Sequence, residues 1–431
     1  MTVRQAVPST CQGRATARPQ TSSARGLRRA LTLLAATALA AGLTGTPPAG
    51  AAIYPVADPD GFYWAPPDLA NFQPGDVIRS RPVATPGFLG ATGYQLLFRS
   101  NDSHDNPIAA ATTLLIPAGG AGSSDTGSSG GRPLLSYQPF VNSLGTHCAP
   151  SHSLFNGEMQ EAVALNLPLT RGWAVNVPDH LGPTSAYGAA QLGGKITLDS
   201  IRAVRRFEPA HLADSQVGLT GYSGGGMATG FAAALAPDYA PELPIVGVAQ
   251  GGVPANIGKL ALEVGQTPHA LFGLGFAAAI GLEREYPAEL NMGPQLNDSG
   301  LALRDQIANA CAGEIISAGA NRSFYDVFLP AAAQAGLNRT DPTLIRVLHE
   351  NSLETFPGVP RAPVYQWHGD ADQVNPGLVR ELAGRYCHAG TPMLLEMVPG
   401  ADHATSVLTG LPHAFAYMSD RFAGLPAPSN C

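Results

Sequence analysis

The segment QVGLTGYSGGGMATGFAAALAP, residues 216–237, joins two kinds of local structure across a very short turn. Its first seven residues predict an apolar strand, and the small apolar residues after Ser223 predict a helix that Pro237 ends. Glycines two residues either side of Ser223 complete a Gly-x-Ser-x-Gly pattern. A strand that passes directly into a helix at a serine predicts a strained turn that projects the hydroxyl from the edge of a sheet.

A second Gly-x-Ser-x-Gly match surrounds Ser129, in very different surroundings. Segment 118–132, AGGAGSSDTGSSGGR, is nearly all Gly, Ser and Ala and has no hydrophobic period. That composition is typical of a flexible surface connection within the core. Because no strand precedes Ser129 and no helix follows it, we interpret this match as chance.

Further apolar runs alternate with helical patterns on both sides of Ser223, which predicts an α/β fold with a mostly parallel sheet and helices on both faces. The expected strands are 133–140, 173–180, 244–252, 362–369 and 392–400, and the expected helices are 198–207 and 376–387.

The alternation stops between residues 254 and 360, where the chain is helical and apolar, for instance over 270–282. We interpret 254–360 as a helical cap, or lid, inserted above the carboxyl edge of a core formed by 53–253 and 361–431. Its helices are either plain core helices or a mobile lid that faces lipid.

The first 52 residues predict an export signal peptide that is removed. They hold six arginines and no acidic residue, then an apolar stretch over 30–43 and an A-x-A-like site. Arg28 and Arg29 leave both the Sec and the twin-arginine route open. No apolar run reaches the ~18 residues of a transmembrane helix, so we expect a secreted chain without a membrane span.

The mature chain is acidic, because loss of the leader changes the formal net charge from −7 to about −13. Such a charge argues against nucleic acid as a partner. Four cysteines remain, and an even number in an exported chain indicates two disulfides, with three possible pairings, or four buried thiols. No H-E-x-x-H motif is present, so we expect no metal and no cofactor.

A serine nucleophile needs an imidazole to accept its proton and a carboxylate to orient that imidazole. In this topology the carboxylate and then the histidine follow later strands. The segment HGDADQVNP after strand 362–369 offers Asp370 and Asp372. We favour Asp372, which lies further into the loop, and expect Asp370 to shape the turn; Asn375 and Pro376 should begin the next helix.

Eleven histidines compete for the role of base. His403, in VPGADHATSV, directly follows the last expected strand, whereas His413 lies inside the final helical stretch, so we predict His403 as the base. The alternative is a surface histidine that caps the final helix. His368 ends a strand before the candidate acid and is set aside.

The oxyanion that forms during acyl transfer needs hydrogen-bond donors. One should be the backbone N–H of Gly224, directly after the nucleophile. The second should come from the loop YQPFVNSLG, residues 137–145.

Six motifs, in order, resemble the secretory lipases of the lipase A type. They are SYQPFVNSLGTHCAPSHS, PDHLG, GYSGGG, HGDADQVNP, GADHATS and the terminal SNC, and the resemblance extends from DGFYWAPP to Cys431. It implies an α/β-hydrolase core with a helical cap and hydrolysis of triacylglycerols and other esters at an oil–water interface. It further implies the triad Ser223, Asp372 and His403, and the disulfides Cys148–Cys311 and Cys387–Cys431.

One residue departs from the family. Where its members commonly have an aspartate as side-chain oxyanion donor, this chain has Asn142, which we expect to take that role or merely to order the loop.

Other functions on the same fold stay open at this point. They are a short-chain esterase, an acyltransferase, a serine peptidase and a non-catalytic surface protein. The sequence leaves the oligomeric state open.

Overall fold

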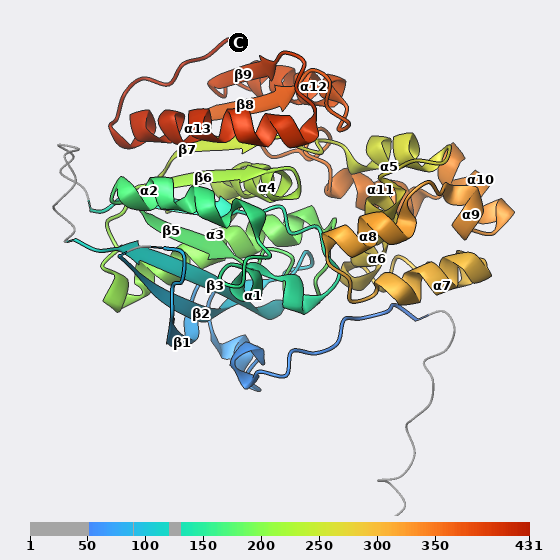
Figure 1. Ribbon diagram of the computed structural model, residues 1–431, viewed down its shortest axis with the longest axis horizontal. Helices are drawn as coiled ribbons and strands as arrows, with labels where there is room; N and C mark the ends of the chain where they lie inside the picture. Colours follow the sequence, from blue (N-terminus) through green and yellow to red (C-terminus); the bar gives the residue numbers. More distant parts are fainter. Residues whose placement is uncertain (1–50, 89, 120–130) are drawn as a thin grey trace, which may run out of the picture. The chain divides into compact units, whose positions relative to one another are not determined.

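The structure, a computed structural model, describes residues 51–88, 90–119 and 131–431, which belong to one compact unit. Nearly all of the expected export signal, and Ser129, lie outside the described residues. The unit is organised on a nine-stranded sheet of order β1-β2-β3-β5-β4-β6-β7-β8-β9 (Figure 1). The strands are β1 Val77–Val83, β2 Ala91–Asn101, β3 Pro107–Pro117, β4 Leu134–Gln138, β5 Ala174–Pro178, β6 Val217–Tyr222, β7 Ile245–Gly251, β8 Val364–Gly369 and β9 Met393–Val398.

The six strands from β4 to β9 lie within the segments predicted from the sequence and pair in parallel, in the order β5-β4-β6-β7-β8-β9. The prediction of a mostly parallel sheet is therefore confirmed. The sequence analysis missed β1, β2 and β3, which pair antiparallel with one another, and β3 with β5. β2 and β3 are buried on both faces for much of their length, so they lack the period-two alternation that marks a half-exposed strand.

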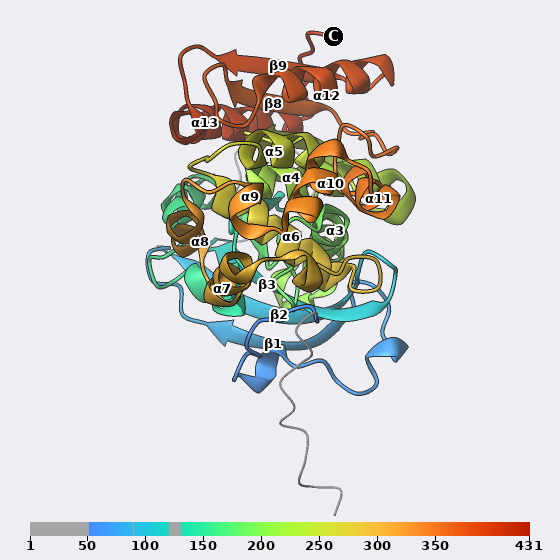
Figure 2. The same ribbon diagram turned by 90° about the vertical axis from the view of Figure 1, so that its right-hand side faces the viewer.

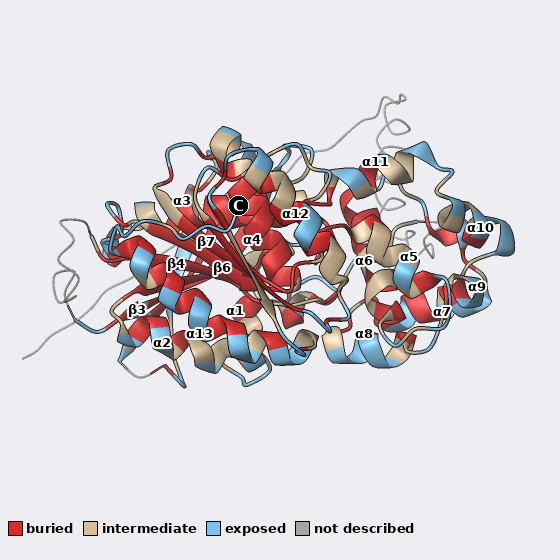
Figure 3. Ribbon diagram, turned by 90° about the horizontal axis from the view of Figure 1, so that it is seen from above, coloured by how far each residue is buried: buried red, intermediate tan, exposed pale blue. Residues whose placement is uncertain are grey.

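Helices cover both faces of the sheet. Neighbouring residues of β4 show the division, because Leu134 packs in one hydrophobic cluster and Leu135 in the other. In Figure 3 the strands β4, β6 and β7 and helix α4 are largely red, the colour of buried residues. The first cluster takes side chains from α3 Ala190–Arg206, α4 Gly224–Tyr239 and α12 Pro376–His388. The second takes them from α2 Asn166–Thr170 and α13 His403–Phe422, and from Leu154, which directly follows the short helix α1 Pro150–Ser153.

Two helix boundaries differ from those expected. The prediction that Pro237 ends its helix is wrong, because α4 continues to Tyr239. Pro237 removes only one hydrogen bond in the last turn, and the N–H of Ala240 closes that turn on the Ala236 carbonyl at 3.0 Å. Helix α3 begins two turns earlier than expected and so includes Gly194. A Cβ at Gly194 would meet Leu235 and Phe231 of α4. Glycine there permits close packing of the two helices.

Every residue between β7 and β8 is described, and this segment contains helices but no strand. Figure 1 shows them, yellow to orange, beyond one end of the strands, and Figure 2 is turned so that they face the viewer. The helices over residues 272–327 share a hydrophobic cluster that includes Phe272, Phe276 and Ile280 and extends to Leu144 after β4. The helices are α5 Ile257–Gly265, α6 Phe272–Glu285, α7 Asp298–Ile307, α8 Ala312–Gly319, α9 Phe324–Val327, α10 Pro330–Asn338 and α11 Pro342–Glu350.

Six short 3-10 helices connect these elements in the part of the chain that the structure describes. They are η1 Gly61–Tyr63, η2 Leu69–Asn71, η3 Thr146–Cys148, η4 Gln160–Leu165, η5 Glu208–Ala210 and η6 Gly293–Gln295.

Both disulfides that the family resemblance implies are formed. Cys148–Cys311 joins the segment after β4 to the start of α8, and Cys387–Cys431 joins α12 to the end of the chain. Among the described residues, no helix combines the length and the apolar character needed to cross a membrane.

The C-terminal tail covers the outer edge of β9. The backbone N–H of Asn430 donates to the Met393 carbonyl at 2.9 Å. Its side-chain amide accepts from the Leu395 N–H at 2.9 Å and donates to the Leu395 carbonyl at 2.8 Å. One asparagine thus satisfies both backbone groups that an incoming strand would need.

We expect Asn430→Ala to begin aggregating at a lower temperature than wild type, because it leaves the Leu395 backbone groups free to pair with another chain. Light scattering during a thermal ramp measures the onset. Asn338→Ala, at an exposed helical position whose side chain only accepts from Gln334, is the matched control. An onset equal to that of the control would contradict an edge-covering role.

Candidate active site

The structure brings Ser223, His403 and Asp372 into one hydrogen-bonded chain. The Ser223 Oγ lies 2.9 Å from His403 Nε2. The Nδ1 of the same ring lies 2.8 and 2.9 Å from the two carboxylate oxygens of Asp372. Ser223 follows β6, Asp372 lies in the loop after β8, and His403 is the first residue of α13 after β9. All three therefore lie at the carboxyl ends of parallel strands.

Ser223 has the strained backbone expected of a strand-to-helix turn, with φ 54° and ψ −122°. Its N–H donates to the Gly251 carbonyl at 2.8 Å, which ties the turn to β7. A Cβ at Gly225 would overlap the Gln138 carbonyl of β4, and one at Gly221 would lie 2.6 Å from the Gly225 carbonyl. The glycines therefore allow α4 to begin directly against the two central strands.

The two candidate carboxylates have different partners. Asp372 is buried, and its Oδ1 accepts from the Val374 N–H at 2.7 Å in addition to its contact with His403. The exposed Asp370 accepts from the Gly400 N–H at 2.6 Å and so joins its turn to the end of β9. Asp370 thus has the turn-shaping contact expected of it.

Gly224 and Asn142 lie together beside the serine. Gly224 is the first residue of α4, a position whose N–H has no acceptor within the helix. Asn142, in the loop after β4, has φ 44°, a left-handed conformation that asparagine tolerates better than most residues. A Cβ at Gly224 would overlap the Asn142 amide oxygen, which is buried and has no hydrogen-bond partner among the described residues. The Asn142 amide is therefore packed against the residue that follows the serine.

A cavity of about 1260 Å³ opens onto these residues. Ser223, His403 and Asn142 form part of its wall, and helices α5, α6, α8, α10 and α11 form much of the rest. Most side chains that the helices contribute are apolar, among them Leu274, Phe276, Leu344, Ile345 and Leu348. The arrangement suits an apolar substrate whose reactive carbonyl meets the serine.

Glu161 is an acidic group in the wall of the same cavity. Its Oε1 accepts from the backbone N–H of Phe140 at 3.0 Å, in the loop that carries Asn142. Burial raises the pKa of the Glu161 carboxyl to about 7, although bonds from its own N–H and from Phe140 partly oppose the rise. Glu161 thereby holds the loop that carries Asn142.

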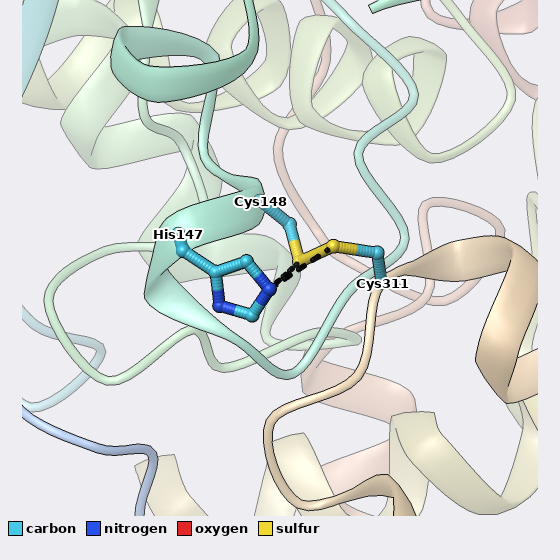
Figure 4. Close-up of side chains that lie close together, drawn as sticks. All are labelled: His147, Cys148 and Cys311. Atoms are coloured by element: carbon cyan, nitrogen blue, oxygen red, sulfur yellow. Dashed lines mark hydrogen bonds between the residues drawn. A yellow bond between two sulfur atoms is a disulfide. The ribbon is translucent and has the colours of Figure 1, made fainter. Parts of the chain in front are cut away.

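His147 lies close to two cysteine sulfurs, the only such group of possible metal ligands among the described residues (Figure 4). Its Nε2 is 3.5 Å from the sulfur of Cys148 and 3.5 Å from that of Cys311. These sulfurs are joined to each other, however, so they offer no thiolate to a metal ion. We assign this group a structural role.

Sequence reasoning missed two contacts that hold His403, the predicted base. The hydroxyl of Tyr222 donates to the His403 carbonyl at 2.6 Å, and the ring centroids of these residues are 5.0 Å apart. The Gln373 side chain accepts from the His403 N–H at 3.2 Å. Both residues are adjacent in sequence to a predicted site residue, which is the one signal that could have identified them.

Comparison with known proteins identifies a secretory lipase family model that matches residues 156–430. A trichothecene C-3 esterase of Fusarium sporotrichioides is 31% identical over 378 residues, covering 84% of this chain and 83% of that protein. A probable inactive lipase of Mycobacterium tuberculosis is 30% identical over 382 residues, covering 85% and 82%. The crystal structure of Candida antarctica lipase A in its closed state is similar with a TM-score of 0.78 and 26% identity, covering 86% of this chain and 89% of that one.

The sheet order, the helices on both faces and the serine at a strand-to-helix turn define an α/β-hydrolase fold. The chain belongs to the secretory lipase family, as its motifs indicate. It is therefore a hydrolase of the lipase or carboxylesterase type, and membership of a secretory family supports an extracellular location.

Separate substitution of Asp372 and Asp370 by asparagine tests which of the two carboxylates orients His403. We expect Asp372→Asn to lower kcat for ester hydrolysis by about 10⁴, because the amide would hold His403 in the wrong tautomer. Asp370→Asn, which keeps an oxygen acceptor for Gly400, is the matched control and should stay near wild type. A larger loss in the Asp370 variant would reverse the assignment.

Asn142 should act as a donor that does not titrate, because an amide carries N–H groups at every ordinary pH whereas a carboxyl donates only when protonated. We expect Asn142→Ala to lower kcat by about 10²–10³ with little change in KM. Asn142→Asp should be active at acidic pH and lose activity as pH rises through the pKa of the new carboxyl. Wild type should stay active on the alkaline side, once His403 is neutral.

Steady-state kinetics of both variants across pH measure these effects. If Asn142→Ala keeps kcat within about threefold of wild type, the residue only orders its loop and a backbone N–H is the second donor.

Proposed function

We propose that this protein is a secreted triacylglycerol lipase that acts through a Ser223–His403–Asp372 triad and an acyl-enzyme intermediate. The observation that carries the proposal is the hydrogen-bonded chain from Ser223 to Asp372 in the wall of an apolar cavity. The family membership fixes the reaction class, and the cavity supports the lipid character of the substrate.

In the first half-reaction the Ser223 Oγ attacks the ester carbonyl carbon while His403 Nε2 accepts the serine proton. Asp372 stabilises the resulting imidazolium through Nδ1–H. The negative charge that develops on the carbonyl oxygen is held by the Gly224 N–H and the Asn142 amide. As the tetrahedral intermediate collapses, His403 gives the proton to the departing alcohol, and the acyl group remains on Ser223.

In the second half-reaction a water molecule attacks the acyl carbon, and His403 accepts a proton from that water. Collapse of the second intermediate returns the proton to the Ser223 oxygen and releases the fatty acid. Free enzyme is regenerated, and the reaction uses one ester and one water without a cofactor.

The mouth of the cavity supports a substrate presented at an oil–water interface. Leu408 of α13 lines the cavity yet is 77% exposed, and Ile316 of α8 is 37% exposed. Exposed aliphatic side chains at a cavity mouth favour contact with lipid over contact with water. Residues 254–360 would then act as the cap over the acyl group, and residues 1–52 as the signal for Sec or twin-arginine export.

One relative is named a probable inactive lipase. Here the three triad side chains are present and hydrogen bonded, which favours an active enzyme. The narrower alternatives are a short-chain esterase, an acyltransferase and a serine peptidase.

Hydrolysis of nitrophenyl esters from C2 to C18, emulsified triacylglycerol and a peptide amide series tests the proposal. We expect kcat/KM to rise with acyl length beyond C4, by up to roughly fourfold per buried CH₂. Ser223→Ala should abolish the activity, and Ser129→Ala, the other Gly-x-Ser-x-Gly serine, should retain it. Preference for acetate without activity on triacylglycerol would make the protein a short-chain esterase, and activity retained in Ser223→Ala would exclude the triad.

A further inference from the structure

His368 lies on the far side of Asp372 from His403. It is the penultimate residue of β8, is 0% exposed, and faces the loop that carries Asp372. Its Nε2 is 2.7 Å from the Val374 carbonyl oxygen and 3.5 Å from Asp372 Oδ2. The sequence analysis set His368 aside because it precedes the acid, but the fold places it against that acid.

The contact with Val374 determines which ring nitrogen carries the proton. A carbonyl oxygen can only accept, so Nε2 must be the protonated nitrogen. Nδ1 is buried and has no hydrogen-bond partner among the described residues, so a second proton there would be unsatisfied. The ring is therefore neutral and directs one N–H at the loop.

The charged surroundings of His368 agree with a neutral ring. Burial lowers the pKa of His368 most strongly, and His403 and Arg380 lower it further. Asp372 and the Val374 carbonyl oppose this shift but do not reverse it. The lowered pKa and the single hydrogen bond at Nε2 both favour the neutral ring.

Val374 connects His368 to Asp372 through its two backbone groups. Its carbonyl accepts from His368, and its N–H donates to Asp372 Oδ1 at 2.7 Å. A shift of Val374 would therefore move a donor away from the carboxylate that orients His403. His368 restrains this arrangement from a β-strand, which is more rigid than the loop itself.

We propose that His368 is a positioning residue for the catalytic acid: its Nε2–H fixes the Val374 turn and faces Asp372 Oδ2, so that the carboxylate stays directed at His403. The inference rests on the proposed triad and deepens it. His368 exchanges no proton with the substrate and does not touch Ser223.

Two polar substitutions of different reach test this role. The glutamine amide nitrogen can occupy the place of Nε2, whereas the asparagine nitrogen ends near the place of Nδ1. We expect His368→Asn to lower kcat by about 10–100-fold at nearly constant KM, because the acid is misaligned. His368→Gln should keep kcat within about threefold of wild type. His388→Gln, at an exposed histidine of α12, is the control for substitution alone.

A second measurement does not depend on catalysis. The proton between His403 Nδ1 and Asp372 gives a downfield NMR signal that should shift or broaden in His368→Asn and return in His368→Gln. Activity retained in Ser223→Ala would overturn the proposed function, whereas the NMR signal still tests the positioning role. Equal kcat values in the two His368 variants, with an unchanged signal in both, would overturn the inference.

Discussion

The close approach of helix α4 to strands β4 and β6 is the constraint on which the rest of the site depends. Gly225 meets the Gln138 carbonyl so closely that no Cβ fits, and Ser223 is held at a positive φ. Such a conformation costs about 1–3 kcal/mol and persists only where the surroundings enforce it. Here α4 enforces it, because most of that helix, Phe231 included, is buried in the main core.

The position of the serine decides where its partners must lie. Parallel strands β6, β8 and β9 end at one edge of the sheet, so the loop after β8 and the start of α13 meet the turn after β6. Ser223 and His403, 180 positions apart in the sequence, can therefore share a hydrogen bond. Parallel topology thus accounts for the Ser–Asp–His order along the chain.

The same logic explains what the sequence could predict and what it could not. Ser223, Asp372 and His403 each follow a predicted strand, and apolar strands between turn residues are visible in sequence. Glu161 and His368 depend on which backbone groups they meet, namely the Phe140 N–H and the Val374 carbonyl, and no local pattern records such contacts. Strands β2 and β3 were missed because burial on both faces removes alternation.

The helices over the site differ in how firmly they are held, which bears on whether they form fixed core or a lid. Ten residues of α6 are buried. Its Arg284 donates to five backbone carbonyls outside the helix, those of Ile53, Leu144, Thr184, Ser185 and Ala308. Burial lowers the pKa of Arg284 to about 10, which leaves it charged at neutral pH. Helices α10 and α11 line the same cavity but bury one residue each. Since local opening begins where little apolar surface is buried, a movement that widens the cavity should involve α10 and α11 while α6 stays with the core.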